Sequence, residues 1–198
     1  MNFMHKASNY YIDLDSRIEK LLRNSEFLGQ GHNGIVFLLP TKQILKIFKD
    51  EKICDKEYNI LKGTKNSKYF PKVYDHGPFY IIREYVGGEP LHNYIKKYGL
   101  KREIAAQIIK LIKEFERLGF RKLDIRCKDI YVGNDSLIKV IDPKNNYSKD
   151  VTYPRHLMKG LYKLDVLDEF LAVVKDEYNE VYEPWSLKIR QYLESGIK

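Results

Sequence analysis

Three closely spaced glycines, at positions 29, 31 and 34, limit the set of folds that this chain can adopt. They lie in the segment G-Q-G-H-N-G-I-V and are followed by the apolar run I-V-F-L-L. Glycine lets the backbone turn tightly and pass close to a ligand such as a phosphate group. A similar spacing opens dinucleotide-binding folds, but there the loop leads into a helix, whereas Ile35 and Val36 favour a strand. The segment therefore predicts a glycine-rich turn between two strands, and an ordinary hairpin without a ligand is the alternative.

A lysine stands inside the next apolar run, Q-I-L-K-I-F. Lys46 is flanked by Leu45 and Ile47, so the alternation of a strand places it on the face opposite theirs. A lysine on a half-buried face costs free energy unless an anion or a carboxylate pairs with it. Glu57, on a helix expected at about residues 50–61, is the natural partner. The alternative is an edge-strand lysine with a solvated glutamate.

The rest of the chain divides into a strand-rich part and a helical part. Asp15 and Ser16 precede a short helical pattern, and apolar runs separated by Gly, Pro and Asn then continue to residue 85. After Gly87 and Gly88 the spacing becomes helical, with a helix expected to end at Gly119. A hairpin at 130–141 and helical patterns at 157–174 and 178–193 follow. We therefore predict an extension at 1–24, a sheet unit at 25–88 and a helical unit at 89–198.

Three aspartates occupy two further motifs. The segment L-D-I-R-C-K-D-I-Y-V holds Asp124, Arg126 and Asp129, and V-I-D-P-K-N places Asp142 at the end of an apolar strand. Carboxylates are the ligands that Mg²⁺ prefers, so such residues suit a phosphate-handling site. Taken singly, each aspartate is also typical of a turn.

The order of these motifs resembles that of protein kinases over about residues 25–145. The resemblance implies that the backbone around Gly29, Gly31, Gly34 and Val36 covers the phosphates of ATP. It also implies that Lys46 holds the α- and β-phosphates and is braced by Glu57. In the segment I-I-R-E-Y-V-G-G, the backbone of Glu84 and Val86 matches the positions that bind adenine, and Arg83 would lie at the back of that pocket.

In the helical unit, the resemblance gives each motif residue a role. Asp124 would accept the proton of the substrate hydroxyl, and Arg126 would steady the transferred phosphate in place of the usual lysine. Asp129 and Asp142 would hold Mg²⁺ or Mn²⁺. The expected fold is α+β and protein-kinase-like with two lobes, an antiparallel β-sheet N-lobe with one helix and a truncated, mainly helical C-lobe.

Several positions depart from the kinase pattern. The usual His-Arg before the catalytic aspartate is Lys122-Leu123, the metal-binding Asn is Asp129, and D-F-G is Asp142-Pro143-Lys144. No A-P-E segment follows, and 56 residues remain after Asp142, so a regulated activation loop does not fit. In brevity the chain is similar to Rio kinases, to the small kinase of the KEOPS assembly and to small bacterial kinase-like proteins.

These features predict an ATP- and metal-dependent phosphotransferase that acts on a Ser/Thr hydroxyl of a protein substrate or on itself. The alternative is a pseudokinase that holds nucleotide as a scaffold or switch. A small-molecule kinase is a third reading, which the short C-terminal part disfavours.

The composition of the chain bears on its charge and on the cellular compartment in which we expect it. The formal net charge is +8, and residues 42–72 hold nine lysines against four acidic residues. This basic flank is consistent with an acidic or RNA-containing partner, and a solvated lysine-rich surface is the alternative. No apolar run approaches the roughly 18 residues of a membrane span, and Cys54 and Cys127 lie far apart without a metal-binding pattern. We therefore expect a cytoplasmic protein with reduced thiols and no membrane partner.

Overall fold

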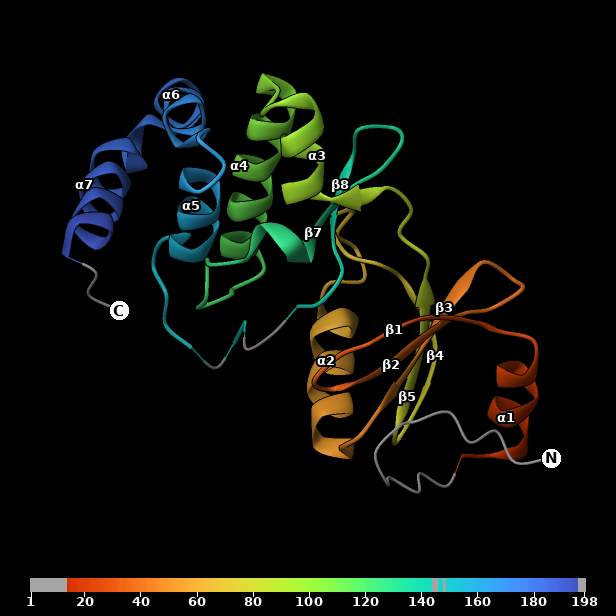
Figure 1. Cartoon of the computed structure of the whole chain (residues 1–198). Helices are drawn as coiled ribbons and strands as arrows, with labels where there is room; N and C mark the ends of the chain where they lie inside the picture. Colours follow the sequence, from red (N-terminus) through yellow and green to blue (C-terminus); the bar gives the residue numbers. More distant parts are fainter. Residues whose placement is uncertain (1–13, 144–145, 148, 196–198) are drawn as a thin grey trace. The chain divides into compact units, whose positions relative to one another are not determined.

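The computed structural model of the chain describes residues 14–143, 146–147 and 149–195. These residues form two compact units (Figure 1). The first is drawn from 14–62 and 72–85, and the second from 63–71 and 86–195. Residues 63–71, which follow the helix of the sheet unit, thus group with the second unit. Lys65 and Lys68 of the lysine-rich stretch go with them.

The first unit is an antiparallel sheet with one helix inserted between its strands. The sheet has the order β1-β2-β3-β5-β4. Its elements are α1 (Ser16–Arg23), β1 (Glu26–Gln30), β2 (Gly34–Leu38), β3 (Gln43–Phe48), α2 (Glu51–Gly63), β4 (Val73–Gly77) and β5 (Tyr80–Glu84). Figure 1 shows α1 and α2 on opposite sides of this sheet. Each face of the sheet therefore has its own helix to pack against.

Helix α1 covers the sheet face that carries Leu45, Ile47, Tyr80 and Ile82. Its side chain Ile18 has no exposed surface and joins that apolar cluster. The predicted helix start is also present, because the Asp15 carboxylate accepts a hydrogen bond of 2.9 Å from the Ile18 N–H.

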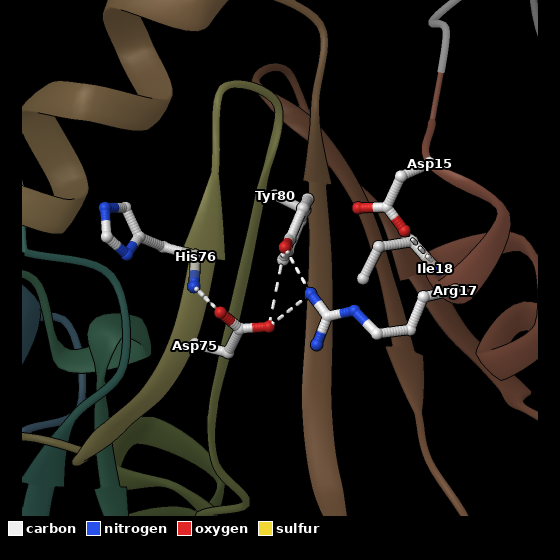
Figure 2. Close-up of polar contacts among 6 residues, drawn as sticks. All are labelled: Asp15, Arg17, Ile18, Asp75, His76 and Tyr80. Carbon is white, nitrogen blue, oxygen red and sulfur yellow. Dashed lines mark hydrogen bonds and ion pairs between the residues drawn. The ribbon is translucent and has the colours of Figure 1, made fainter.

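An ion pair also ties α1 to the sheet. Figure 2 shows the Arg17 guanidinium reaching the Tyr80 hydroxyl and the Asp75 carboxylate, each at 2.6 Å. The same carboxylate accepts a hydrogen bond of 2.8 Å from the His76 N–H. The Arg17 side chain is 57% exposed, so apolar burial of Ile18 contributes more to docking than this pair does.

The second unit is mainly helical, with a small three-stranded sheet of order β6-β7-β8. Its elements are β6 (Glu89–Pro90), α3 (Leu91–Tyr98), α4 (Arg102–Arg117), the 3₁₀ turn η1 (Cys127–Asp129), β7 (Ile130–Val132), β8 (Ile138–Val140), α5 (Arg155–Tyr162), α6 (Leu167–Glu177) and α7 (Asn179–Ser195). Helix α4 supplies much of its core, with Ile108, Leu111 and Phe115 fully buried. Gly119 follows α4 with a φ of +70°, as expected of a helix terminator.

The predicted α+β class is confirmed, and two details differ from the sequence-based expectation. Helix α3, which begins directly after β6, was not predicted from the sequence, because its apolar pattern is short. The helical pattern predicted at 157–174 is broken into α5 and α6, and Asp165 between them has a φ of +58°. No helix of the described residues is long and apolar enough to cross a membrane.

Candidate functional site

The glycine motif forms the tip of the β1–β2 hairpin. Gly29 pairs with Val36 across the two strands. The Gly31 N–H closes the turn by donating a hydrogen bond of 2.8 Å to the Gly34 carbonyl. The motif thus leads into a strand, as predicted, and the helix that a dinucleotide-binding loop requires is absent at this position.

Close packing of the strands explains one of the three glycines of this motif. A Cβ atom at Gly34 would lie 2.0 Å from the Ile47 carbonyl oxygen, so packing of β2 against β3 requires glycine there. A Cβ atom at Gly29 or Gly31 would meet nothing within 4 Å. Neither of these two residues has the positive φ that favours glycine. The fold of the unit therefore leaves Gly29 and Gly31 unexplained, whereas close approach of a ligand would explain them.

Lys46 and Glu57 form an ion pair on the sheet face beneath α2. The Lys46 Nζ lies 2.6 Å from the Glu57 Oε2, and the two side chains are only 9% and 4% exposed. Strand alternation produces this arrangement, because Leu45 and Ile47 enter the opposite core below α1. Removing two charges from water is costly, and a buried pair is weak evidence for stability alone. Such a pair is more readily explained by a function that needs a fixed ammonium group.

Strand β5 carries Arg83 and Glu84, and Val86 follows the strand by two residues. Arg83 is 6% exposed and pairs in register with Ile44, on the sheet face that also carries Lys46. The Glu84 N–H donates a hydrogen bond of 2.8 Å to the Lys72 carbonyl, and the Glu84 carboxylate accepts one of 3.1 Å from the Lys72 N–H. Val86 groups with the second unit. Adenine contact by Glu84 and Val86 therefore stays a prediction.

Asp124 is bound to the first turn of α5. Its side chain is 1% exposed. The Oδ1 atom accepts hydrogen bonds from the backbone N–H groups of His156 at 2.8 Å and Leu157 at 3.4 Å, and the Oδ2 atom contacts the His156 Nδ1. These N–H groups have no partner within the helix, and a carboxylate is favourable at the positive end of the helix dipole. Asp124 thus fixes the loop against α5.

A second contact holds the same loop. The Cys127 Sγ lies 3.7 Å from the Leu157 carbonyl oxygen, and a Cβ atom at Gly160 would lie 2.7 Å from that sulfur. Glycine at 160 therefore allows α5 to approach the loop closely. His156 and Gly160 were not identified from the sequence, because they lie about 30 residues beyond the loop and no local pattern marks them.

Asp129 and Asp142 flank the β7–β8 hairpin at its open end. Asp129 precedes β7, Asp142 follows β8 by two residues, and Ile130 pairs with Val140 between the strands. The Ile141 N–H donates a hydrogen bond of 3.0 Å to the Asp129 carbonyl. Strand pairing thus brings the backbone of the two residues predicted to bind metal to the same end of the hairpin.

Two carboxylates at one edge fit Mg²⁺ or Mn²⁺, which commonly takes one or two protein carboxylates and completes its shell with phosphate oxygens and water. No group of three or more His, Cys, Asp or Glu residues suited to a metal ion occurs among the described residues. A metal at Asp129 and Asp142 would therefore take its remaining ligands from groups other than described His, Cys, Asp or Glu side chains, such as phosphate oxygens and water. Lys144, the last residue of the D-P-K triplet, lies outside the described residues.

Lys122 and Arg126 place two cations on the same loop. Burial lowers the pKa of Lys122, while the charges of Asp124 and Asp129 oppose that shift. Lys122 therefore lies near both carboxylates, at the position where kinases carry histidine. Arg126 is exposed, which leaves its guanidinium accessible to an anion.

Both cysteines are buried free thiols. Burial raises the pKa of both Cys54 and Cys127 to about 12, so each stays a protonated thiol at neutral pH.

A cavity of about 510 Å³ in the second unit lies between α3 and the β7–β8 turn. It is lined by Gly88, Glu89, Tyr94, Lys97, Tyr98, Lys101, Val132, Gly133, Asn134 and Ser136. None of the predicted site residues is among them.

Comparison with known proteins supports the kinase resemblance. The sequence matches no established family profile. A curated protein of Bacillus subtilis (strain 168), "Putative serine/threonine-protein kinase YrzF", is 27% identical over 137 residues, covering 65% of this chain and 64% of that protein. This chain thus spans just under two thirds of the relative's length. The predicted similarity to a small protein-kinase-like family is confirmed.

A solved structure, that of Rad53 1-466 in complex with AMP-PNP, covers 79% of this chain and 48% of that chain. The two are 20% identical and superpose with a TM-score of 0.48.

The buried ion pair predicts a characteristic double-mutant cycle. Glu57→Leu should lower the free energy of unfolding by about 3–5 kcal/mol, because it leaves the Lys46 ammonium buried without that carboxylate. Lys46→Met combined with Glu57→Leu should recover most of the loss, since two apolar side chains carry no desolvation cost. Urea unfolding followed by far-ultraviolet circular dichroism measures both.

The exposed pair of Lys97 and Glu89, with side chains 59% and 25% exposed, is the matched control. The same substitutions there should couple by less than about 1 kcal/mol. Additive effects of the single changes at Lys46 and Glu57 would contradict a tightly coupled buried pair.

Proposed function

We propose that this chain is an ATP- and metal-dependent phosphotransferase that transfers the γ-phosphoryl group to a Ser/Thr hydroxyl of a protein, including its own. The observation that carries the proposal is the buried pair of Lys46 and Glu57 in the unit that also carries the glycine hairpin. Phosphoryl transfer depends mainly on positioning and on neutralising oxygen charge, and a braced ammonium supplies both. The kinase name of the curated relative supports the same reaction class.

The glycine hairpin gives the proposal a second support. Gly29 and Gly31 are not required by packing or by backbone conformation. In the proposed site their N–H groups approach the phosphates of ATP, and a side chain at either position would obstruct that approach. Val36 lies in the middle of the strand that follows, and Glu84 and Val86 would contact adenine through their backbone.

In the second unit, Asp124 is assigned as the group that takes the acceptor proton. The bond between the γ-phosphorus and the bridging oxygen of ATP breaks, a bond from the acceptor oxygen to phosphorus forms, and ADP leaves. Arg126 donates to the oxygens of the transferred group. Asp129 and Asp142 would hold Mg²⁺ or Mn²⁺, which supplies neutralisation of phosphate charge when bound.

A nucleotide-binding pseudokinase is the second candidate, and the state of Asp124 favours it. The carboxylate is 1% exposed and both of its oxygens contact α5. Acting as a base requires that an acceptor hydroxyl reach it past His156, whose side chain is 41% exposed. If that contact does not open, the chain binds ATP without transferring phosphate.

Nucleotide binding predicts a thermal shift that Gly31→Ala reduces. ATP with Mg²⁺ or Mn²⁺ at about 100 times its dissociation constant should add roughly 2.7 kcal/mol to folding stability. Gly31→Ala should leave the melting temperature without nucleotide unchanged or slightly higher, because alanine restricts the unfolded chain. Its shift with ATP should shrink, as should that of Lys46→Met. Differential scanning fluorimetry measures these shifts.

Gly34→Ala is the matched control, since its Cβ atom would clash with the Ile47 carbonyl. That variant should lose stability with or without nucleotide. A parent protein whose melting curve ignores millimolar ATP with either metal would contradict the whole assignment of the site.

Phosphoryl transfer should depend on Asp124. Asp124→Asn keeps an oxygen that accepts from the α5 N–H groups but removes the basic carboxylate, so nucleotide binding should persist while transfer is lost. Incubation with radiolabelled ATP, followed by gel autoradiography and thin-layer detection of ADP, reads both outcomes.

Asp165→Asn, an exposed change in the same unit, should transfer phosphate as the parent does, because asparagine tolerates its φ of +58°. Equal transfer by Asp124→Asn and parent would show that Asp124 is not the base. No transfer by the parent, together with an intact thermal shift, would favour the pseudokinase.

A further inference from the structure

Helices α5 and α7 of the second unit form a cationic surface beside Asp124. The two helices pack against each other, and Figure 1 shows them side by side. We define the α5–α7 cationic surface by four cations and two tyrosines: Arg126, Tyr153, Arg155, Lys159, Lys188 and Tyr192. Tyr153 lies just before α5, and Arg126 lies on the loop that carries Asp124.

The two tyrosine rings hold three of these cations in place. The Arg155 guanidinium and the Lys159 Nζ each lie 5.2 Å from the centre of the Tyr192 ring. The Lys159 Nζ also donates a hydrogen bond of 3.1 Å to the Tyr192 hydroxyl. The Lys188 Nζ lies 5.5 Å from the centre of the Tyr153 ring. Cation–π contacts thus hold Arg155 and Lys159 against one ring and Lys188 against the other.

Ion pairs within the described part of the chain do not neutralise these cations. No described carboxylate lies within ion-pair distance of Arg126, Arg155, Lys159 or Lys188, although Arg102 and Arg121 each have such a partner. The Nε atom of Arg155 is buried and has no hydrogen-bond partner among the described residues. A group of like charges held together in this way attracts an anion from outside.

The surface adjoins the proposed base. The first N–H groups of α5 donate to Asp124, so Arg155 lies one residue before that contact. Burial raises the pKa of Tyr153, the negative charge of Asp124 adds to this shift, and Arg155 opposes it. Tyr153 is therefore near both groups. A molecule that presents a hydroxyl to Asp124 would have its flanking atoms within reach of these cations.

We infer that the α5–α7 cationic surface binds an anionic segment of a polypeptide substrate, with aspartate, glutamate or phosphorylated side chains close to the acceptor hydroxyl. The inference rests on the proposed function and adds the class of substrate. Single-stranded RNA fits less well, because it binds by stacking bases on open aromatic rings. Here both tyrosine rings already have cations placed over them.

Binding of three peptides tests this inference directly. All carry one serine acceptor, flanked by glutamates, by phosphoserines or by lysines, and fluorescence anisotropy at low and at physiological salt gives their affinities. We expect the glutamate and phosphoserine peptides to bind and the lysine peptide not to bind. The two anionic peptides together show whether carboxylate or phosphoryl groups are preferred. Affinity should fall as salt rises.

Lys188→Glu should weaken binding of the anionic peptides about five- to tenfold, because it removes an attraction and adds a repulsion. In assays of phosphoryl transfer, the KM for these peptides should rise. The kcat and the KM for ATP should stay nearly unchanged. Lys175→Glu is the matched control, since Lys175 is an exposed lysine of α6 that lies 5.5 Å from the centre of the Tyr182 ring. It should change affinity less than twofold. Lys159→Gln should give a smaller loss than Lys188→Glu.

Equal affinity for acidic and basic peptides, or equal effects of Lys188→Glu and Lys175→Glu, would overturn the inference. Tighter binding of an oligouridylate than of either anionic peptide, lost in Lys188→Glu, would replace it with an RNA site. Failure of the proposed function is distinguishable, because peptide binding is measured without ATP. If the parent protein binds acidic peptides but transfers no phosphate, the binding surface is supported and the proposed phosphotransferase activity is rejected.

Discussion

The ion pair between Lys46 and Glu57 exists only while α2 packs on the face of the sheet that lacks α1. Both side chains are nearly excluded from water, so a shift of the helix that broke this contact without admitting water would leave two buried charges without their ion pair. The placement of α2 and the alternation of β3 are therefore linked through one contact. The cost of burying this pair is reasonable if the ammonium serves an anion, and the glycine hairpin of the same unit supplies a loop suited to phosphates.

The second unit depends in a similar way on the contact between Asp124 and the first turn of α5. That contact fixes the loop on which Arg126 and Asp129 lie, and Gly160 lets α5 approach the sulfur of Cys127. It also occupies the carboxylate that the kinase resemblance assigns as base. The contact between Asp124 and α5 thus stabilises the unit and limits the access of a substrate to the Asp124 carboxylate. The chain acts as an enzyme if an acceptor hydroxyl can displace His156, and as a pseudokinase if it cannot.

Short sequence patterns predicted the features that depend on a single strand or on elements that follow each other in the chain. Lys46 between Leu45 and Ile47 gave the facing of β3, the glycine spacing gave the hairpin, and Asp15 gave the start of α1. Contacts between residues far apart in the chain could not be predicted, because no short pattern encodes them. His156 meets Asp124 across 32 positions, and the division of 157–174 into two helices depends on a turn at Asp165. The cations around Tyr153 and Tyr192 become a surface only once α5 and α7 are packed.

Calorimetric titration of ATP into the parent and Asp129→Asn proteins, each with EDTA, Mg²⁺ and Mn²⁺, tests the central claim most directly. If the carboxylates of Asp129 and Asp142 share a cation with the phosphates, the parent should bind ATP tightly only with metal, since two like charges repel until it arrives. Asp129→Asn removes one charge and should bind ATP with a weaker dependence on metal. Superimposable titrations of the two proteins under all three conditions, or no heat of binding from the parent, would contradict the proposed nucleotide and metal site.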